Sequence, residues 1–170
     1  MIEISEEAYD GPAGSVLVAA MHQEIIDRYA GETADWTEEE LAADEAAHFA
    51  EVTPEQTRRP LGAFLVARID GEPAGCGALK PLGDGTATGE IKRMYTVPDA
   101  RRRGVSRAIL LRLEEIAAEL GYERIQLETG TAQPEALALY ESQGWERIEP
   151  YGRYKAEPSS RCYAKRTVAS

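Results

Sequence analysis

The sequence predicts one domain, spanning residues 1–170, of the α/β class: an α+β mixed sheet in which an antiparallel meander precedes a parallel strand–helix–strand unit. A length of 170 residues fits one domain, and an apolar content of 43% is enough for an ordinary core. Residues 64–97 follow the alternating period of strands and contain two Asp-Gly turns. From residue 105 the apolar period becomes helical and a strand pattern follows, which predicts a right-handed parallel crossover.

The first 60 residues predict a short strand and two helices. Apolar and acidic residues alternate around Ile2–Ile4, as in a strand. The first helix spans Ala13–Tyr29, where apolar side chains recur at helical spacing, and Gly31 can end it. The second helix is predicted to begin near Thr37, whose side chain can cap it, and acidic residues 38–40 suit the positive end of the helix dipole.

The rest of the chain switches between the two periods. Glycines 121 and 144 are placed to end the two later helices, and proline is tolerated at the start of the second of them. The predicted strands are 64–69, 74–82, 87–97, 124–129, 145–148 and 162–166, and the predicted helices are 106–120 and 134–143.

Charge and composition exclude several classes of function. The formal net charge is −11, and the first 60 residues carry 15 acidic and 3 basic side chains. Nucleic-acid binding relies on Lys and Arg beside phosphates, so no nucleic-acid partner is expected. The acidity weakly favours a cationic partner, and a role in solubility alone is equally consistent with it. No apolar run is long enough to span a bilayer and no basic segment begins the chain, so we expect a cytoplasmic protein without a membrane partner.

The two cysteines, Cys76 and Cys162, form no CxxC motif, and the histidines are not clustered. This pattern predicts neither a disulfide framework nor a zinc site, and no metal is expected. Both cysteines stand in apolar, strand-like segments. Buried free thiols are therefore expected.

A candidate anion site follows the strand that ends at Val97-Pro98. The turn Arg101-Arg102-Arg103-Gly104 leads directly into a helix. Unpaired backbone N–H groups and a partial positive charge at a helix start suit phosphate, and Gly104 permits close approach of the main chain. These residues alone also fit three surface arginines that solubilise a helix start. Known nucleotide motifs fail, because no GxxxxGK[ST] is present and a strand, not a helix, continues from Gly75-Cys76-Gly77.

The turn resembles the (Gln/Arg)-x-x-Gly-x-(Gly/Ala) pyrophosphate-binding motif of the GNAT superfamily of N-acetyltransferases. Arg101 takes the first position and Gly104 the central one, while Ser106 stands where the family usually has Gly or Ala. Residues 136–145 resemble the family's Ala-x-x-Leu-Tyr-x-x-x-Gly-Phe segment, with Trp145 in place of Phe. Two such motifs in this order, with the expected elements between them, are a specific sign of this superfamily. The resemblance extends roughly from residue 2 to residue 166 and implies the GNAT fold, with helices on both faces of the sheet, and acetyl transfer from acetyl-CoA.

The resemblance also implies how acetyl-CoA is held as the co-substrate. The main chain of Met94, Tyr95 and Val97 would pair with the pantetheine arm, which lies like an added strand beside the sheet, and the amides of residues 102–107 would hold the pyrophosphate. Gln133 stands where many members use Asn. The implied cofactor-binding residues are Met94, Tyr95, Val97, Arg102, Arg103, Gly104, Val105, Ser106, Arg107, Gln133 and Tyr140.

Acetyl transfer needs a neutral amine, a donor to the oxyanion and a proton for the leaving thiolate. Family members commonly use a tyrosine at the position of Tyr140 as the general acid; its helical spacing alone would also fit a core aromatic. Glu90 is the candidate general base. It can instead bind a cation or pair structurally with Lys92 or a neighbouring strand. A main-chain N–H near Tyr95 is the candidate oxyanion donor.

The superfamily usually builds its acceptor site from the first two helices, the loop between them and the late connection. Here that places Tyr29, Trp36, Glu90 and Tyr151 as candidate substrate contacts. The expected acceptor is a primary amine of a cationic small molecule. Two alternatives stay open: a protein or peptide N-acetyltransferase, and a non-catalytic acyl-CoA-binding sensor. Dimers are frequent in the superfamily, so a homodimer is one expected state.

Overall fold

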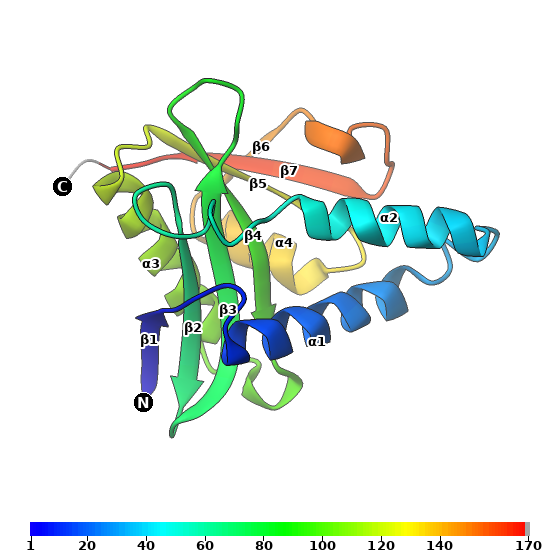
Figure 1. Ribbon diagram of the computed structural model, residues 1–170. Helices are drawn as coiled ribbons and strands as arrows, with labels where there is room; N and C mark the ends of the chain where they lie inside the picture. The colour runs from blue at the N-terminus through cyan, green and yellow to red at the C-terminus, as the bar shows by residue number, and fades with distance from the viewer. Residues whose placement is uncertain (169–170) are drawn as a thin grey trace.

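Seven strands form one mixed sheet in the computed structural model, which describes residues 1–168 (Figure 1). The sheet order is β1-β2-β3-β4-β5-β7-β6, with only the β4–β5 pair parallel. The strands are β1 (Ile2–Glu6), β2 (Ala63–Ile69), β3 (Glu72–Pro81), β4 (Thr88–Thr96), β5 (Arg124–Gly130), β6 (Glu146–Ile148) and β7 (Ser160–Arg166). The helices are α1 (Pro12–Tyr29), α2 (Glu38–Ala50), α3 (Val105–Glu119) and α4 (Pro134–Ser142), with 3₁₀ turns η1 (Pro98–Ala100) and η2 (Gly152–Tyr154).

The predicted fold class is confirmed: a meander from β1 to β4 is followed by the parallel β4–α3–β5 unit. The predicted element bounds agree with the observed ones to within two residues. The turn between β2 and β3 has Asp70 and Gly71 at φ 53° and 86°, the left-handed backbone that an Asp-Gly hairpin turn requires. The sequence did not predict that β7 lies between β5 and β6.

Helix α3 packs tightly on one face of the sheet. It buries six residues: Val105, Ile109, Leu110, Leu113, Ile116 and Ala117. At Gly77 of β3, a Cβ atom would lie 2.7 Å from both Ile109 Cγ2 and Met94 Sδ. The glycines of this strand therefore let helix and sheet approach closely, which is consistent with the failure of the nucleotide motif.

Helices α1 and α2 cover the opposite face (Figure 1), but only α1 contributes to the core. Leu17, Val18 and Met21 of α1 pack on a second apolar cluster that includes Cys76. The expectation of buried free thiols is confirmed at Cys76 and at Cys162. Helix α2 begins with the predicted cap, since Thr37 and Glu40 form a reciprocal capping box, yet none of its residues is buried.

Strands β4 and β5 part halfway along their length. Their register ends at the pair Glu90↔Gln126, although β4 continues to Thr96 and β5 to Gly130. Arg93 has a φ of 58°, and the β3–β4 register shifts beside it, so β4 carries a bulge there. A bulge bends its strand. The sheet therefore opens beyond Glu90 and leaves the β5 side of β4 without a registered partner.

Candidate active site

A cavity of about 620 Å³ lies where β4 and β5 part. Two of its lining residues, Ile91 and Tyr140, belong to the core under α3 and α4. Others, including Lys92 and Glu128, follow the alternation of β4 and β5 to the side of α1 and α2. The cavity thus passes between the strands and joins both faces of the sheet. Its volume lies in the range of small-molecule sites.

Tyr140 contributes a buried phenol to this cavity. The residue is 4% exposed on α4, and its ring centroid lies 5.9 Å from that of Trp145 and 6.1 Å from that of Tyr163. Burial, and secondarily the charge of Glu128, raises the pKa of Tyr140. The hydroxyl is therefore protonated throughout the neutral range and can donate to a group in the cavity.

Glu128 is the site residue that the sequence analysis missed. Its neighbours Ile125 and Leu127 belong to the apolar core, and strand alternation turns Glu128 to the other face. Ser160 Oγ donates a 3.0 Å hydrogen bond to its Oε1. Burial raises the pKa of Glu128 to about 7, against a smaller opposing effect of Lys92. The available signal was a single carboxylate in a strand that also supplies the core residues Ile125 and Leu127, because a carboxylate is seldom buried without a role.

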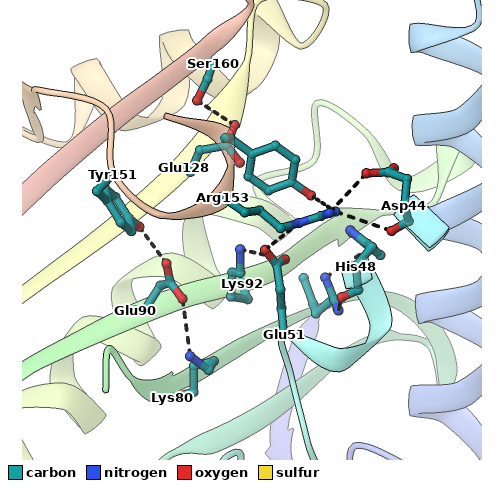
Figure 2. Close-up of polar contacts among 12 residues, drawn as sticks. Asp44, His48, Glu51, Lys80, Glu90, Lys92, Glu128, Tyr151, Arg153 and Ser160 are labelled. Atoms are coloured by element: carbon teal, nitrogen blue, oxygen red, sulfur yellow. Dashed lines mark hydrogen bonds and ion pairs between the residues drawn. The ribbon is translucent and has the colours of Figure 1, made fainter. Parts of the chain in front are cut away.

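Glu90 does not line the main cavity, and Figure 2 shows it between Tyr151 and Lys80. Tyr151 donates a 2.8 Å hydrogen bond to Glu90 Oε2, and Lys80 Nζ of the neighbouring strand lies 3.4 Å from Oε1. These groups border a second pocket of about 140 Å³, whose walls include Glu128 and Lys92 and so adjoin the larger cavity. The structure therefore brings together two predicted site residues, Glu90 and Tyr151, but at the second pocket and not in the main cavity.

Ion pairs connect α2 to the late loop along the edge of the cavity (Figure 2). Arg153 lies 3.0 Å from Asp44 and 3.0 Å from Glu51, and it stacks over the ring of Tyr154 at 4.4 Å. Lys92 Nζ lies 3.1 Å from Glu51 Oε2. None of these ion pairs was predicted, since Arg153 lies about 100 residues from Asp44 and Glu51, and Lys92 lies on a different element from Glu51.

Arg93 fastens the end of α2 to the sheet. Its guanidinium donates to the main-chain oxygen of His48 at 2.6 Å and to the hydroxyl of Tyr9 at 3.2 Å, and it lies 3.1 Å from His48 Nε2. Burial and the charge of Arg93 lower the pKa of His48 to about 3. The imidazole is therefore neutral at physiological pH, and Nε2 can accept from the arginine.

Two further predicted contacts, Tyr29 and Trp36, line the main cavity, as does Gln133 at the start of α4. The Tyr29 ring lies against the backbone of Gly130, where an added Cβ would be 1.7 Å from the hydroxyl. Tyr29, Trp36, Gln133 and Tyr140 are thus gathered on one cavity, although they come from segments spread over more than 100 residues.

The arginine turn leaves an exposed anion site at the start of α3. Gly104 occupies the N-cap in the left-handed region, at φ 86°, and Arg102, Arg103 and Gly104 are exposed. Arg101, in contrast, is held by an ion pair with Glu24 and a 3.2 Å hydrogen bond to the main-chain oxygen of Thr96. The first amides of the helix have no partner within the helix. Amides and two arginines are therefore free to face a pyrophosphate.

The remaining predicted cofactor contacts differ in how free they are. Ser106 Oγ lies 2.7 Å from Thr96 Oγ1, so the residue that departs from the family motif ties α3 to the end of β4. The Val97 amide donates to Ala74 O and its carbonyl accepts from the Ala100 amide. Of the main-chain positions that the sequence suggested for pantetheine, Met94 and Tyr95 lie on the part of β4 that has no registered partner on its β5 side. Two further predicted contacts, for the pyrophosphate, lie on α3. The side chain of Val105 is buried in the core, and Arg107 Nε lies 3.4 Å from Gln143 Oε1.

Within residues 1–168, no helix combines the length and apolar character needed to cross a membrane. Over the same stretch, no three His, Cys, Asp or Glu side chains are grouped so as to hold a metal ion.

Comparison with known proteins identifies the family. Residues 19–145 match the acetyltransferase (GNAT) family. An IAA acetyltransferase of Azospirillum brasilense is 36% identical over 137 residues, which cover 81% of this chain and 82% of the relative. A Klebsiella pneumoniae protein assigned as an acyl-CoA N-acyltransferase superposes with a TM-score of 0.73 and 26% identity over 99% of both chains. The PaiA N-acetyltransferase of Thermoplasma acidophilum, solved with coenzyme A, shares the fold at a TM-score of 0.65 and 18% identity over 98% and 99% of the two chains.

The cavity between parted strands and the anion site at the start of α3 fit this assignment. The chain belongs to the acetyltransferase (GNAT) family and is an N-acetyltransferase that takes its acetyl group from acetyl-CoA.

Proposed function

We propose that this enzyme acetylates the primary amine of a cationic small molecule by direct attack of the amine on acetyl-CoA, within a single domain. The observation that carries the proposal is the cavity between β4 and β5, to which Tyr140 and Glu128 contribute a phenol and a carboxylate. A donor for the leaving sulfur and an acceptor for the amine proton are the two groups that this reaction needs. The cavity volume of about 620 Å³ favours a small molecule over a peptide.

The residues that would hold acetyl-CoA lie along the edge of β4 and the start of α3. Acetyl-CoA supplies the thioester carbonyl that the amine attacks. The amides after Gly104, with Arg102 and Arg103, bind the pyrophosphate, since a helix start favours a negative group. The main chain of Met94 and Tyr95 pairs with the pantetheine arm along the stretch of β4 that has no registered partner.

Tyr140 serves as the donor to the leaving sulfur. A free thiol has a pKa of about 8.5, and burial raises the pKa of Tyr140 above its ordinary value. Complete proton transfer from the phenol to the thiolate is therefore uphill. A hydrogen bond that strengthens as negative charge develops on sulfur is the contribution best matched to this environment.

Two carboxylates compete for the role of base. Glu90 has both oxygens engaged, by Lys80 and by Tyr151, and does not line the main cavity. Glu128 lines it and has a pKa raised to about 7, which suits a group that must accept a proton at neutral pH. We therefore propose that Glu128 accepts the amine proton, and that Glu90 positions Tyr151 and, through it, the late loop.

Steady-state kinetics over a pH range tests these roles with three variants. We expect Tyr140→Phe to lower kcat about 10²- to 10³-fold while acetyl-CoA affinity changes little, because one hydrogen-bond donor to the developing thiolate is lost. We expect Glu128→Gln to remove the rise of kcat/KM near pH 7, and Glu90→Gln to keep that rise. If Glu90→Gln removes the rise instead, Glu90 is the base.

The acceptor class is tested separately by release of free CoA with a panel of amines and peptides. Turnover with small amines supports the proposal. Turnover with peptides alone favours a protein or peptide N-acetyltransferase. Binding of acetyl-CoA without turnover across the panel favours a non-catalytic sensor. Sedimentation of the purified protein tests the expectation of a homodimer.

A further inference from the structure

The helical wall of the main cavity is apolar and incompletely covered. Six of its side chains are apolar or aromatic: Met21, Ile25, Ile26, Tyr29, Trp36 and Leu41. Three of them remain markedly exposed, with Ile26 at 46%, Trp36 at 39% and Leu41 at 43%. Since α2 buries no residue, Leu41 has no packing role in the core. An apolar group in the cavity would cover these side chains.

The carboxylates of the cavity differ between its inner and outer parts. Lys92 and Arg153 are already paired with Glu51, and Arg153 also with Asp44. Glu128, in contrast, is largely buried and forms no ion pair with any side chain of residues 1–168. It is therefore the carboxylate in the inner part of the cavity that can pair with an ammonium of the substrate.

The remaining acidic side chains that line the cavity are all exposed: Glu32, Glu38, Glu45 and Glu157. Water and salt screen such exposed charges strongly. They can draw a cation toward the cavity without fixing a second ammonium in it.

We propose that the acceptor is an apolar monoamine, with its single amino group at Glu128 and an uncharged aryl or alkyl body against Ile26, Trp36 and Leu41. This inference rests on the proposed function and names the substrate class of the same cavity. Burial of the body removes apolar surface of both partners from water. A second ammonium on the body would have to be desolvated against that wall without a buried carboxylate beside it.

A matched pair of acceptors tests the inference directly. Hexylamine and 1,6-diaminohexane have the same chain and differ in one terminal ammonium. We expect kcat/KM to be at least about tenfold higher for hexylamine, and 2-phenylethylamine to behave like hexylamine, because removal of one charge from an apolar wall is worth at least that factor. Equal or better use of the diamine overturns the inference and leaves amine acetylation standing.

Variants of the wall give an independent readout. Leu41→Ser and Trp36→Ala are expected to raise KM for hexylamine about tenfold and to reduce the preference over the diamine, with smaller changes in kcat. Val16→Ser is the matched control, since Val16 is 69% exposed on α1 and does not line the cavity. A KM for Leu41→Ser equal to that of Val16→Ser overturns the inference. If none of the amines is acetylated, the proposed function fails, and this inference fails with it.

Discussion

Helices α3 and α2 have similar lengths, 15 and 13 residues, and cover opposite faces of the same sheet, but they are held in different ways. Helix α3 buries six side chains in the main core. Helix α2 buries none; it is held by polar contacts, Arg93 to His48 and Arg153 to Asp44 and Glu51, and by the rings of His48 and Phe49 against His22 of α1. A helix that buries no side chain leaves volume between itself and the sheet. The comparison indicates that the cavity lies under α2 because α2 packs less closely than α3.

The largest expected difference between the two helices comes from one substitution made in each. Leu113→Ala on α3 removes a fully buried side chain and should lower the free energy of unfolding by about 2–5 kcal/mol. Leu41→Ala on α2 removes an exposed one and should change it by less than about 1 kcal/mol. Urea denaturation of both variants measures the contrast. Equal losses would mean that α2 is packed as α3 is.

The carboxylate beneath α2 should make stability depend on pH. The pKa of Glu128 is raised from its ordinary value of 4.5 to about 7 in the folded state, because burial favours the protonated form. Its contribution to the free energy of unfolding is therefore fully present below pH 4.5 and is lost as pH rises through 7. Glu128→Gln removes this loss. Relative to the parent protein, the variant should gain about 3 kcal/mol between pH 4 and pH 8, the equivalent of the shift. Urea denaturation at both pH values measures the gain; a constant difference contradicts it.

The attachment of α2 through Arg93 should be worth less than the α3 core but more than a surface contact. Arg93→Met leaves the main-chain oxygen of His48 and the hydroxyl of Tyr9 without their donor, which should cost about 2 kcal/mol. Arg124→Met, at an exposed position on β5, is the control. Hydrogen exchange of the α2 amides should rise in the first variant alone. Unchanged exchange there would show that other contacts hold the helix.

The smallest expected effect concerns the partly exposed ion pairs of Arg153. Arg153→Gln should lower the free energy of unfolding by about 1 kcal/mol or less, and the loss should shrink at high salt, because such pairs are screened. Thermal unfolding at low and high ionic strength measures this. A loss that is large and independent of salt would instead place the pair in a dry environment.

Much of the fold could be predicted because its signals are local. The cap at Thr37, the Asp70-Gly71 turn and the stops at Gly121 and Gly144 depend on a few neighbouring residues. The change from the strand period to the helix period at α3 could be predicted because its buried residues recur every three or four positions. The position of β7 between β5 and β6 was not predicted, because strand order depends on packing between distant segments.

The candidate site was predictable only where a motif marks it. The turn before α3 and Tyr140 stand in recognisable segments, whereas Glu128, Arg93 and Arg153 do not. Glu90 was predicted as the base from its position in the resemblance, but in the structure it contacts Lys80 and Tyr151. Nothing in the chain near Glu90 indicates that the two central strands part just beyond it.

The sequence by itself determined the class of fold and the reaction family, since both follow from short runs of residues, and it predicted an anion site at the start of α3. Only the tertiary structure decided which carboxylate reaches the cavity. That choice depends on the bulge at Arg93 and on the end of the β4–β5 register at Glu90. Once the strands part, alternation along β5 turns Glu128 into the opening, while Glu90 stands at the last paired position and borders the second pocket instead.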